Sequence, residues 1–194
     1  MNDYNKIVII GIGNLLLMDE GIGVHTINEL EKYDLPNNVE MYDGGTGGFK
    51  LIDLMHNTKK VIFIDAVEID KAPGAITVFK SKDVRSLYPK KKYSLHDTDL
   101  LEVIKMTEML DNPPDIEIVG IQPKTIDYGT TLSKELADSM SNIVSTVRKR
   151  IEEVCLDGQR AYWVCTLIEE SEELEAQSAE ELFLDIKKAI PNIK

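Results

Sequence analysis

The stretch from Lys6 to Val24 reads KIVIIGIGNLLLMDEGIGV and decides the fold. It begins with a β-branched apolar run that is typical of a strand buried on both faces, and this run ends in glycine. A loop follows, and apolar periodicity around Gly21–Tyr33 predicts a helix after the loop. The order strand, loop, helix is the unit from which parallel sheets are built.

The same alternation continues to residue 153. Further strands are predicted at Val39–Asp43, Lys60–Ala66, Ala75–Lys80 and Ile116–Gly120, of which Ala75–Lys80 is expected at an edge. Further helices are predicted at Phe49–Met55, Asp97–Leu110 and Ser133–Glu153. We therefore expect an α/β fold, a three-layer α/β/α sandwich around a mostly parallel, twisted sheet of five strands.

The composition excludes several classes of partner. Among 194 residues, 22 Lys and Arg stand against 34 Asp and Glu, which gives a formal net charge of −12. Phosphate contacts need a basic face, so we expect no nucleic acid and no membrane as partner. The N-terminus has only four consecutive apolar residues before its first glycine, too few for a signal peptide, and we expect a cytoplasmic protein.

Cysteine chemistry is excluded from most of the chain, because Cys155 and Cys165 both lie in the last forty residues. A cysteine nucleophile, a zinc finger or a CxxC redox centre therefore cannot serve the main body. A chain of this length needs no metal to supply its core. Any metal site in the main body must be built from His and carboxylate side chains, and its role would be chemical.

The first loop invites a dinucleotide interpretation that then fails. Gly11 and Gly13 resemble the start of a Rossmann fingerprint, but the third glycine would fall on Leu16. Asp19 and Glu20 also place two negative charges where a pyrophosphate would need the positive end of a helix. A dinucleotide-dependent oxidoreductase is the weakest interpretation.

Acidic and imidazole side chains follow several predicted strands. Asp65 comes directly after a buried apolar strand, at the sheet edge where open parallel sheets bind ligands, and His96 lies in a later loop or first helical turn. Each has a simpler explanation alone: Asp19 and Glu20 could cap a helix, Asp65 could cap a turn, and a lone His is usually solvated. Together, carboxylates and an imidazole at one edge suit zinc, nickel, iron or manganese, with positions left open.

Five ordered blocks within roughly the first 150 residues carry a resemblance to a known family. They are GIGNLLLMDEGIGV at 11–24, DGGTGG at 43–48, IFIDAV at 62–67, SLHDTDL at 94–100 and IVGIQP at 118–123. In this order and spacing they resemble the hydrogenase maturation proteases. The resemblance implies an endopeptidase that recognises nickel already inserted in a [NiFe]-hydrogenase large-subunit precursor and then removes a C-terminal peptide.

The resemblance also implies a site. The family's metal ligands fall on Glu20, Asp65 and His96, while no residue is assigned as catalytic. Nickel is expected to arrive with the substrate, and other divalent ions fit the same ligands. The ion could polarise the scissile carbonyl or activate a water, and the sequence does not choose between these. The alternative function is a non-enzymatic nickel-sensing or nickel-delivery partner that uses the same ligands.

The glycine-rich loop is the candidate substrate-binding segment. Asp43, Gly44, Gly45 and Thr46 offer backbone N–H groups and little steric bulk, which would let an extended peptide approach closely. The loop is equally well explained as a turn between a strand and a helix, and both interpretations stay open.

Residues 154–194 depart from the family. They hold the only Trp and both Cys, and QRAYWVCTLIEESEELEAQSAEE resembles a fragment of RecG-type DNA helicases. The chain contains no Walker-type phosphate loop, so no ATPase activity follows. We expect a protease-like domain at 1–153 and an appendage of a strand and an acidic helix at 154–194. The apolar run Ala161–Leu167 would favour self-association of the chain.

Overall fold

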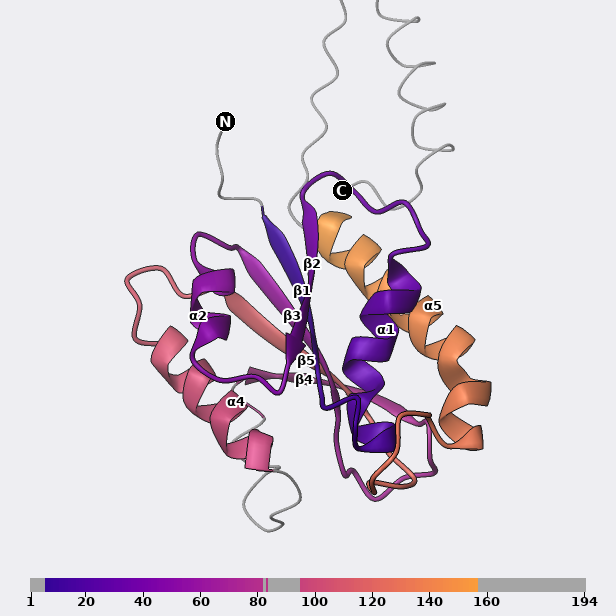
Figure 1. Ribbon diagram of the computed structural model, residues 1–194. Coiled ribbons are helices and arrows are strands. Elements are labelled where there is room, and N and C mark those ends of the chain that lie inside the picture. The colour runs from indigo at the N-terminus through magenta and orange to yellow at the C-terminus, as the bar shows by residue number, and fades with distance from the viewer. Residues whose placement is uncertain (1–5, 82, 84–94, 157–194) are drawn as a thin grey trace, which may run out of the picture. The chain divides into compact units, whose positions relative to one another are not determined.

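A five-stranded sheet forms the middle layer of the structure, a computed structural model that describes residues 6–81, 83 and 95–156 (Figure 1). The strand order is β2-β1-β3-β5-β4, with all neighbours parallel except β4, which runs antiparallel to β5 at one edge. The predicted mostly parallel five-stranded sheet is confirmed, as is the edge position of the fourth strand. The strands are β1 (Ile7–Ile12), β2 (Val39–Gly45), β3 (Lys60–Ala66), β4 (Ile76–Lys80) and β5 (Asp115–Ile121).

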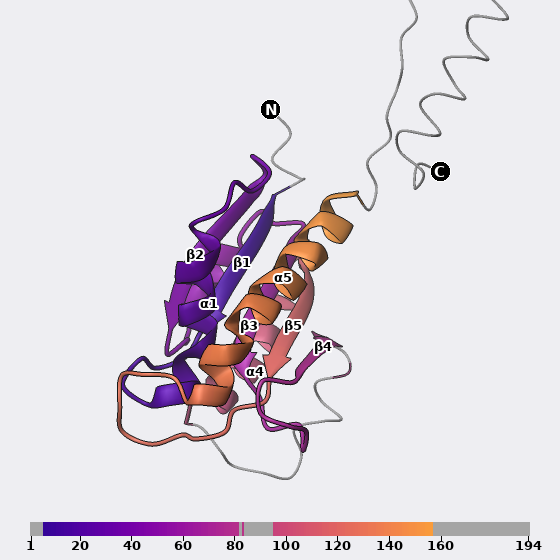
Figure 2. The same ribbon diagram turned by 90° about the vertical axis from the view of Figure 1, so that its right-hand side faces the viewer.

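Helices cover both faces of the sheet. Figure 2 shows α1 (Ile22–Leu30) and α5 (Lys134–Leu156) together on one face, and Figure 1 shows α2 (Lys50–Met55) and α4 (Leu95–Thr107) on the other. A short 3₁₀ helix, η2 (Met18–Gly21), precedes α1. The three-layer sandwich is therefore confirmed, and α5 continues three residues beyond its predicted end at Glu153.

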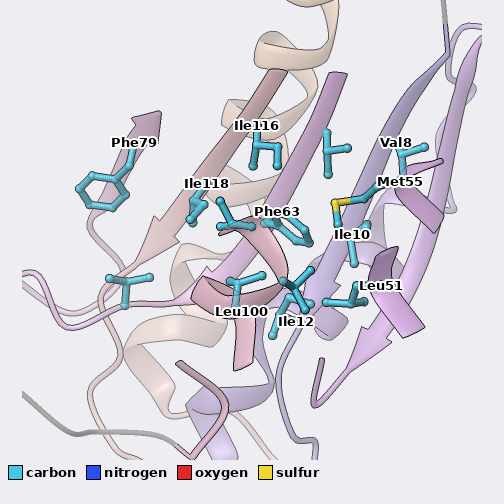
Figure 3. Packing of buried hydrophobic residues seen from close by; sticks show 14 residues of the cluster. Val8, Ile10, Ile12, Leu51, Met55, Phe63, Phe79, Leu100, Ile116 and Ile118 are labelled. Atoms are coloured by element: carbon cyan, nitrogen blue, oxygen red, sulfur yellow. The ribbon is translucent and has the colours of Figure 1, made fainter. Parts of the chain in front are cut away.

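The strands alternate their side chains between two apolar cores. Val8 and Ile10 of β1, with Phe63 of β3, pack against α2 and α4 (Figure 3), whereas Ile7 and Ile9 face α1 and α5. Every residue of β1 is buried, because successive side chains point to opposite faces and both faces are covered. This double burial is why the strand appears in the sequence as a continuous apolar run.

The chain order across the sheet creates a switch point. From β1 the chain leads to β2 on one side, and from β3 it leads to β4 and β5 on the other side. Neighbouring strands whose connections depart in opposite directions leave room at their carboxyl ends, and open α/β sheets bind ligands there. The loops that follow β1 and β3 are thus placed for function.

The described residues all belong to one compact unit, Met1–Asp157. From residue 157 onward the tail lies outside the described residues, so its boundary, its strand and its helicase resemblance stay predictions. None of the helices within the described part of the chain has the length and apolar character required to cross a bilayer.

Candidate functional site at the carboxyl ends of β1 and β3

Glycines bring the first loop and α1 into direct backbone contact with the sheet. A Cβ atom at Gly23 would lie 2.1 Å from the carbonyl oxygen of Ile64 and 2.2 Å from that of Ile12. A Cβ atom at Gly13, where φ is +142°, would lie 2.0 Å from the carbonyl oxygen of Glu20. At Gly11 a Cβ atom would lie 2.3 Å from the Gly23 carbonyl oxygen, so Gly11 and Gly13 both require glycine for close packing, which explains their Rossmann-like spacing without a pyrophosphate.

Asp19 is a buried link between two loops. Its Oδ2 accepts hydrogen bonds from the backbone N–H groups of Lys124 at 3.0 Å and Thr125 at 2.9 Å, and its Oδ1 accepts one from Ser133 at 2.7 Å. The side chain is fully buried. Helix α1 starts from Gly21 without a side-chain cap, so the interpretation that this acidic pair caps the helix is wrong.

Glu20, the first predicted metal ligand, lies in η2 and is 3% exposed. Its Oε2 accepts a hydrogen bond from the backbone N–H of Asn14, so the carboxylate points back across its own loop. The Asn14 side chain in turn accepts a hydrogen bond from the Leu16 N–H at 2.9 Å. The loop is therefore closed around the Glu20 carboxylate.

Asp65, the second predicted ligand, is the penultimate residue of β3 and is 6% exposed. Its partner in register on β5 is Gly120, which has no side chain. The short helix that carries Glu20 packs against β3. The structure thus places both acids at the carboxyl edge of the sheet, on elements in contact with each other.

His96, the third predicted ligand, is the second residue of α4. Figure 1 shows α4 and α1 beginning at the same end of the sheet, which is the end where β1 and β3 finish. The side chains of residues 95–99 lie outside the described part. Among the side chains that are described, no group of three His, Cys, Asp or Glu could hold a metal ion. The three-ligand site therefore stays a prediction.

The glycine-rich loop adjoins the loop that carries Glu20. The Gly13 N–H donates to the Gly45 carbonyl oxygen at 2.7 Å, and the Asp43 carboxylate accepts the Gly45 N–H at 2.7 Å. Gly44 is buried against β1, whereas Thr46 is exposed. The turn requires glycine and the surface above Gly48 is open, so both interpretations of the loop still stand. Positive φ angles occur at Gly45, Gly47 and Gly48.

Gln122 was not predicted as part of this edge. Its side chain, 4% exposed, accepts the N–H groups of Ile69 at 2.8 Å and Lys71 at 3.3 Å. It donates to Glu68 at 2.8 Å and to the carbonyl oxygen of Pro123 at 3.0 Å. Gln122 therefore fixes the loop that follows Asp65. The only signal in the sequence is an amide side chain directly after an apolar strand.

Known proteins show the same fold and related sequences. Hydrogenase expression/formation protein HupD of Bradyrhizobium diazoefficiens is 34% identical over 140 residues, 71% of this chain and 73% of that protein. Hydrogenase 2 maturation protease of Escherichia coli is 35% identical over 125 residues, 63% of this chain and 76% of that protein. The structure of hydrogenase maturating endopeptidase HybD from E. coli superposes with a TM-score of 0.70 and 30% identity, over 76% of this chain and 93% of that one.

The matched region covers most of this chain but a smaller share of some relatives. Against five further curated hydrogenase expression/formation proteins, the chain spans only 62–65% of the relative's length. Residues 24–150 match the family model described as hydrogenase maturation protease. The predicted family, fold class and enzyme class, a protease, are confirmed by these matches. The chain belongs to the hydrogenase maturation protease family.

Proposed function

We propose that the chain is an endopeptidase that removes the C-terminal peptide of a [NiFe]-hydrogenase large-subunit precursor after nickel insertion. Glu20, Asp65 and His96 would hold the nickel that arrives with the precursor. The observation that carries this proposal is the placement of two buried carboxylates at the carboxyl edge of β1 and β3, in a chain of the maturation protease family. In this proposal the nickel ion belongs to the precursor and is therefore part of the substrate.

The donor set fits a borderline divalent ion. Two carboxylates and one imidazole leave coordination positions open, as a site that inspects a metal already bound elsewhere requires. A divalent ion in such a place polarises a carbonyl or lowers the pKa of a bound water. Within this chain, the Asn14 N–H orients the Glu20 carboxylate, and β3 fixes the position of Asp65.

The substrate peptide would lie along the glycine-rich loop. The hydrogen bond between Gly13 and Gly45 joins this loop to the loop that carries Glu20. Exposed Thr46 and the open surface above Gly48 leave room for an extended segment beside the two acids. A peptide held there would present its scissile bond to the ion.

The test incubates the full chain with nickel-loaded and nickel-free precursor and measures the mass of the precursor. We expect shortening of the loaded precursor alone, and loss of cleavage in Glu20→Gln and Asp65→Asn. His96→Ala should lower nickel affinity more than either acid variant, because imidazole is the only nitrogen ligand. Asp127→Asn, at an exposed position, is the control.

Three results separate the alternatives. Equal cleavage of both precursors would refute the nickel dependence. Binding of the loaded precursor without shortening would favour the nickel-sensing or nickel-delivery partner. Unchanged nickel affinity in His96→Ala would remove that residue from the site.

A further inference from the structure

The loop that carries Glu20 is locked to a distant loop. Besides the three backbone N–H groups that Asp19 accepts, the Asp19 N–H donates to the Thr125 carbonyl oxygen at 3.2 Å. Gly129 adds two more hydrogen bonds, accepting the Met18 N–H at 3.0 Å and donating to the Leu16 carbonyl oxygen at 2.9 Å. The segment after β1 and the segment after β5 therefore form one hydrogen-bonded unit.

Asp19 is the centre of this unit. Burial of a carboxylate is costly unless its oxygens are hydrogen-bonded, and bonds from N–H groups to a charged acceptor are among the stronger ones. No basic side chain takes part in its described hydrogen bonds, since the Lys124 ammonium pairs with Glu135 instead. All the described hydrogen bonds to the Asp19 carboxylate come from backbone N–H groups, and they hold in place the backbone that supplies them.

The backbone of Asp19 also holds the segment that follows it in the chain. The Asp19 carbonyl oxygen accepts the N–H of Ile22, and the Glu20 N–H donates to the Leu17 carbonyl oxygen at 3.2 Å, so the peptide unit that joins Asp19 to Glu20 is held at both of its polar groups. We propose that Asp19 is a positioning residue: its carboxylate locks the loop after β1 to the loop after β5 and thereby holds the Glu20 carboxylate in place. The inference rests on the assignment of Glu20 to the proposed site.

The test compares Asp19→Asn with Asp127→Asn by NMR in the metal-free full chain. Asparagine keeps the shape of Asp19 but replaces one accepting oxygen with an NH₂ group. Asp127 is the matched control, because it lies in the same loop after β5 and its substitution removes the same charge. Among the described residues, the Asp127 carboxylate accepts a hydrogen bond only from the adjacent Tyr128 N–H.

Two signals are expected to change in Asp19→Asn alone. The amides of Lys124, Thr125 and Ser133 should exchange about tenfold faster or more, because a buried hydrogen bond is lost. The Asn14 amide proton and the Glu20 carboxyl ¹³C resonance should also shift, because the bond between these groups weakens. The shift at Asn14 and Glu20 distinguishes a positioning role of Asp19 from a purely structural one.

The inference is overturned if the three amides lose protection while the Asn14 and Glu20 resonances stay unchanged. Should Asp19→Asn not fold, Ser133→Pro removes one donor to the same carboxylate and must move the same two resonances. In nickel titrations the Kd of Asp19→Asn should rise about tenfold relative to Asp127→Asn. Failure of the wild-type chain to shorten the nickel-loaded precursor would refute the proposed function but would leave the NMR result standing.

Discussion

Glu117→Gln should destabilise the chain from the end of the sheet opposite the proposed site. Glu117 of β5 has a side chain only 2% exposed, and its carboxylate accepts from Lys60 at 2.7 Å and from Arg150 at 2.6 and 2.7 Å. Lys60 begins β3, whereas Asp65 nearly ends it. The buried ion network and the candidate site thus occupy opposite ends of the same strand.

The magnitude follows from what each cation retains. Removing one partner of a buried ion pair costs about 3–5 kcal/mol when the other charge is left unpaired. In Glu117→Gln, Lys60 keeps its ion pair with Asp115. Arg150, whose side chain is 29% exposed, keeps its ion pair with Glu153. We therefore expect a loss of about 2–3 kcal/mol in the free energy of unfolding at neutral pH.

The pH dependence has a definite sign. Burial alone would raise the pKa of Glu117, but the hydrogen bonds from Arg150 and Lys60 outweigh it and lower this pKa below the ordinary 4.5. A carboxylate with a lowered pKa in the folded state stabilises fully above its unfolded pKa and loses that contribution as the pH falls through the folded value. The loss in the free energy of unfolding caused by Glu117→Gln should therefore be constant above about pH 5.5 and should shrink below about pH 4.5.

Urea unfolding at several pH values measures both effects, with Glu152→Gln on the exposed side of α5 as the control for charge. Glu117→Gln should keep wild-type nickel affinity at neutral pH, because the network lies away from the carboxyl edge. A deficit below about 1 kcal/mol at pH 7, or one that grows on acidification, would refute this reasoning.

Three further predictions concern the loops and the end of the domain. Gly23→Ala should lower stability by about 2 kcal/mol in urea unfolding, and should weaken nickel binding, because its Cβ meets carbonyl oxygens of β1 and β3. Gln122→Met should cost about 2 kcal/mol by leaving its backbone partners unpaired, and an unchanged urea midpoint would contradict this. A chain cut after Asp157 should unfold cooperatively and self-associate less than the full chain in sedimentation. A cut after Glu153 should be about 1 kcal/mol less stable, since it removes Val154 from the core.

The layers of the fold could be predicted because they depend on local pattern. In β1 and β3 both faces are buried, and this produces apolar runs with clear ends in the sequence. The edge strand β4 is only partly buried, yet the short run Ala75–Lys80 still predicts a strand at an edge. The local sequence pattern could not predict the order of the strands in the sheet, because that order depends on contacts between residues that are far apart in the chain.

The roles of the two adjacent acids could not be separated by the same means. Asp19 and Glu20 are neighbours of like chemistry, but the partners of the Asp19 carboxylate lie 105 to 114 positions away, whereas the described partner of the Glu20 carboxylate is six positions away. Local pattern carries no information about such distant donors. Glu20 was singled out by the family resemblance. The roles of Asp19 and Gln122 could not be predicted, because the backbone N–H groups that donate to both side chains are distant in the sequence.

The Rossmann-like appearance of the first loop has a physical origin in backbone packing. Gly23 allows the start of α1 to lie against the carboxyl ends of β1 and β3, which is a demand shared with dinucleotide-binding folds. There the bare N–H groups of the helix face a phosphate. Here the segment between Gly13 and Gly21 places Asp19 and Glu20 in the 3₁₀ helix just before α1, where their carboxylates accept backbone N–H groups from outside α1. Two carboxylates at this edge disfavour a polyanion, which supports the cation site that we propose.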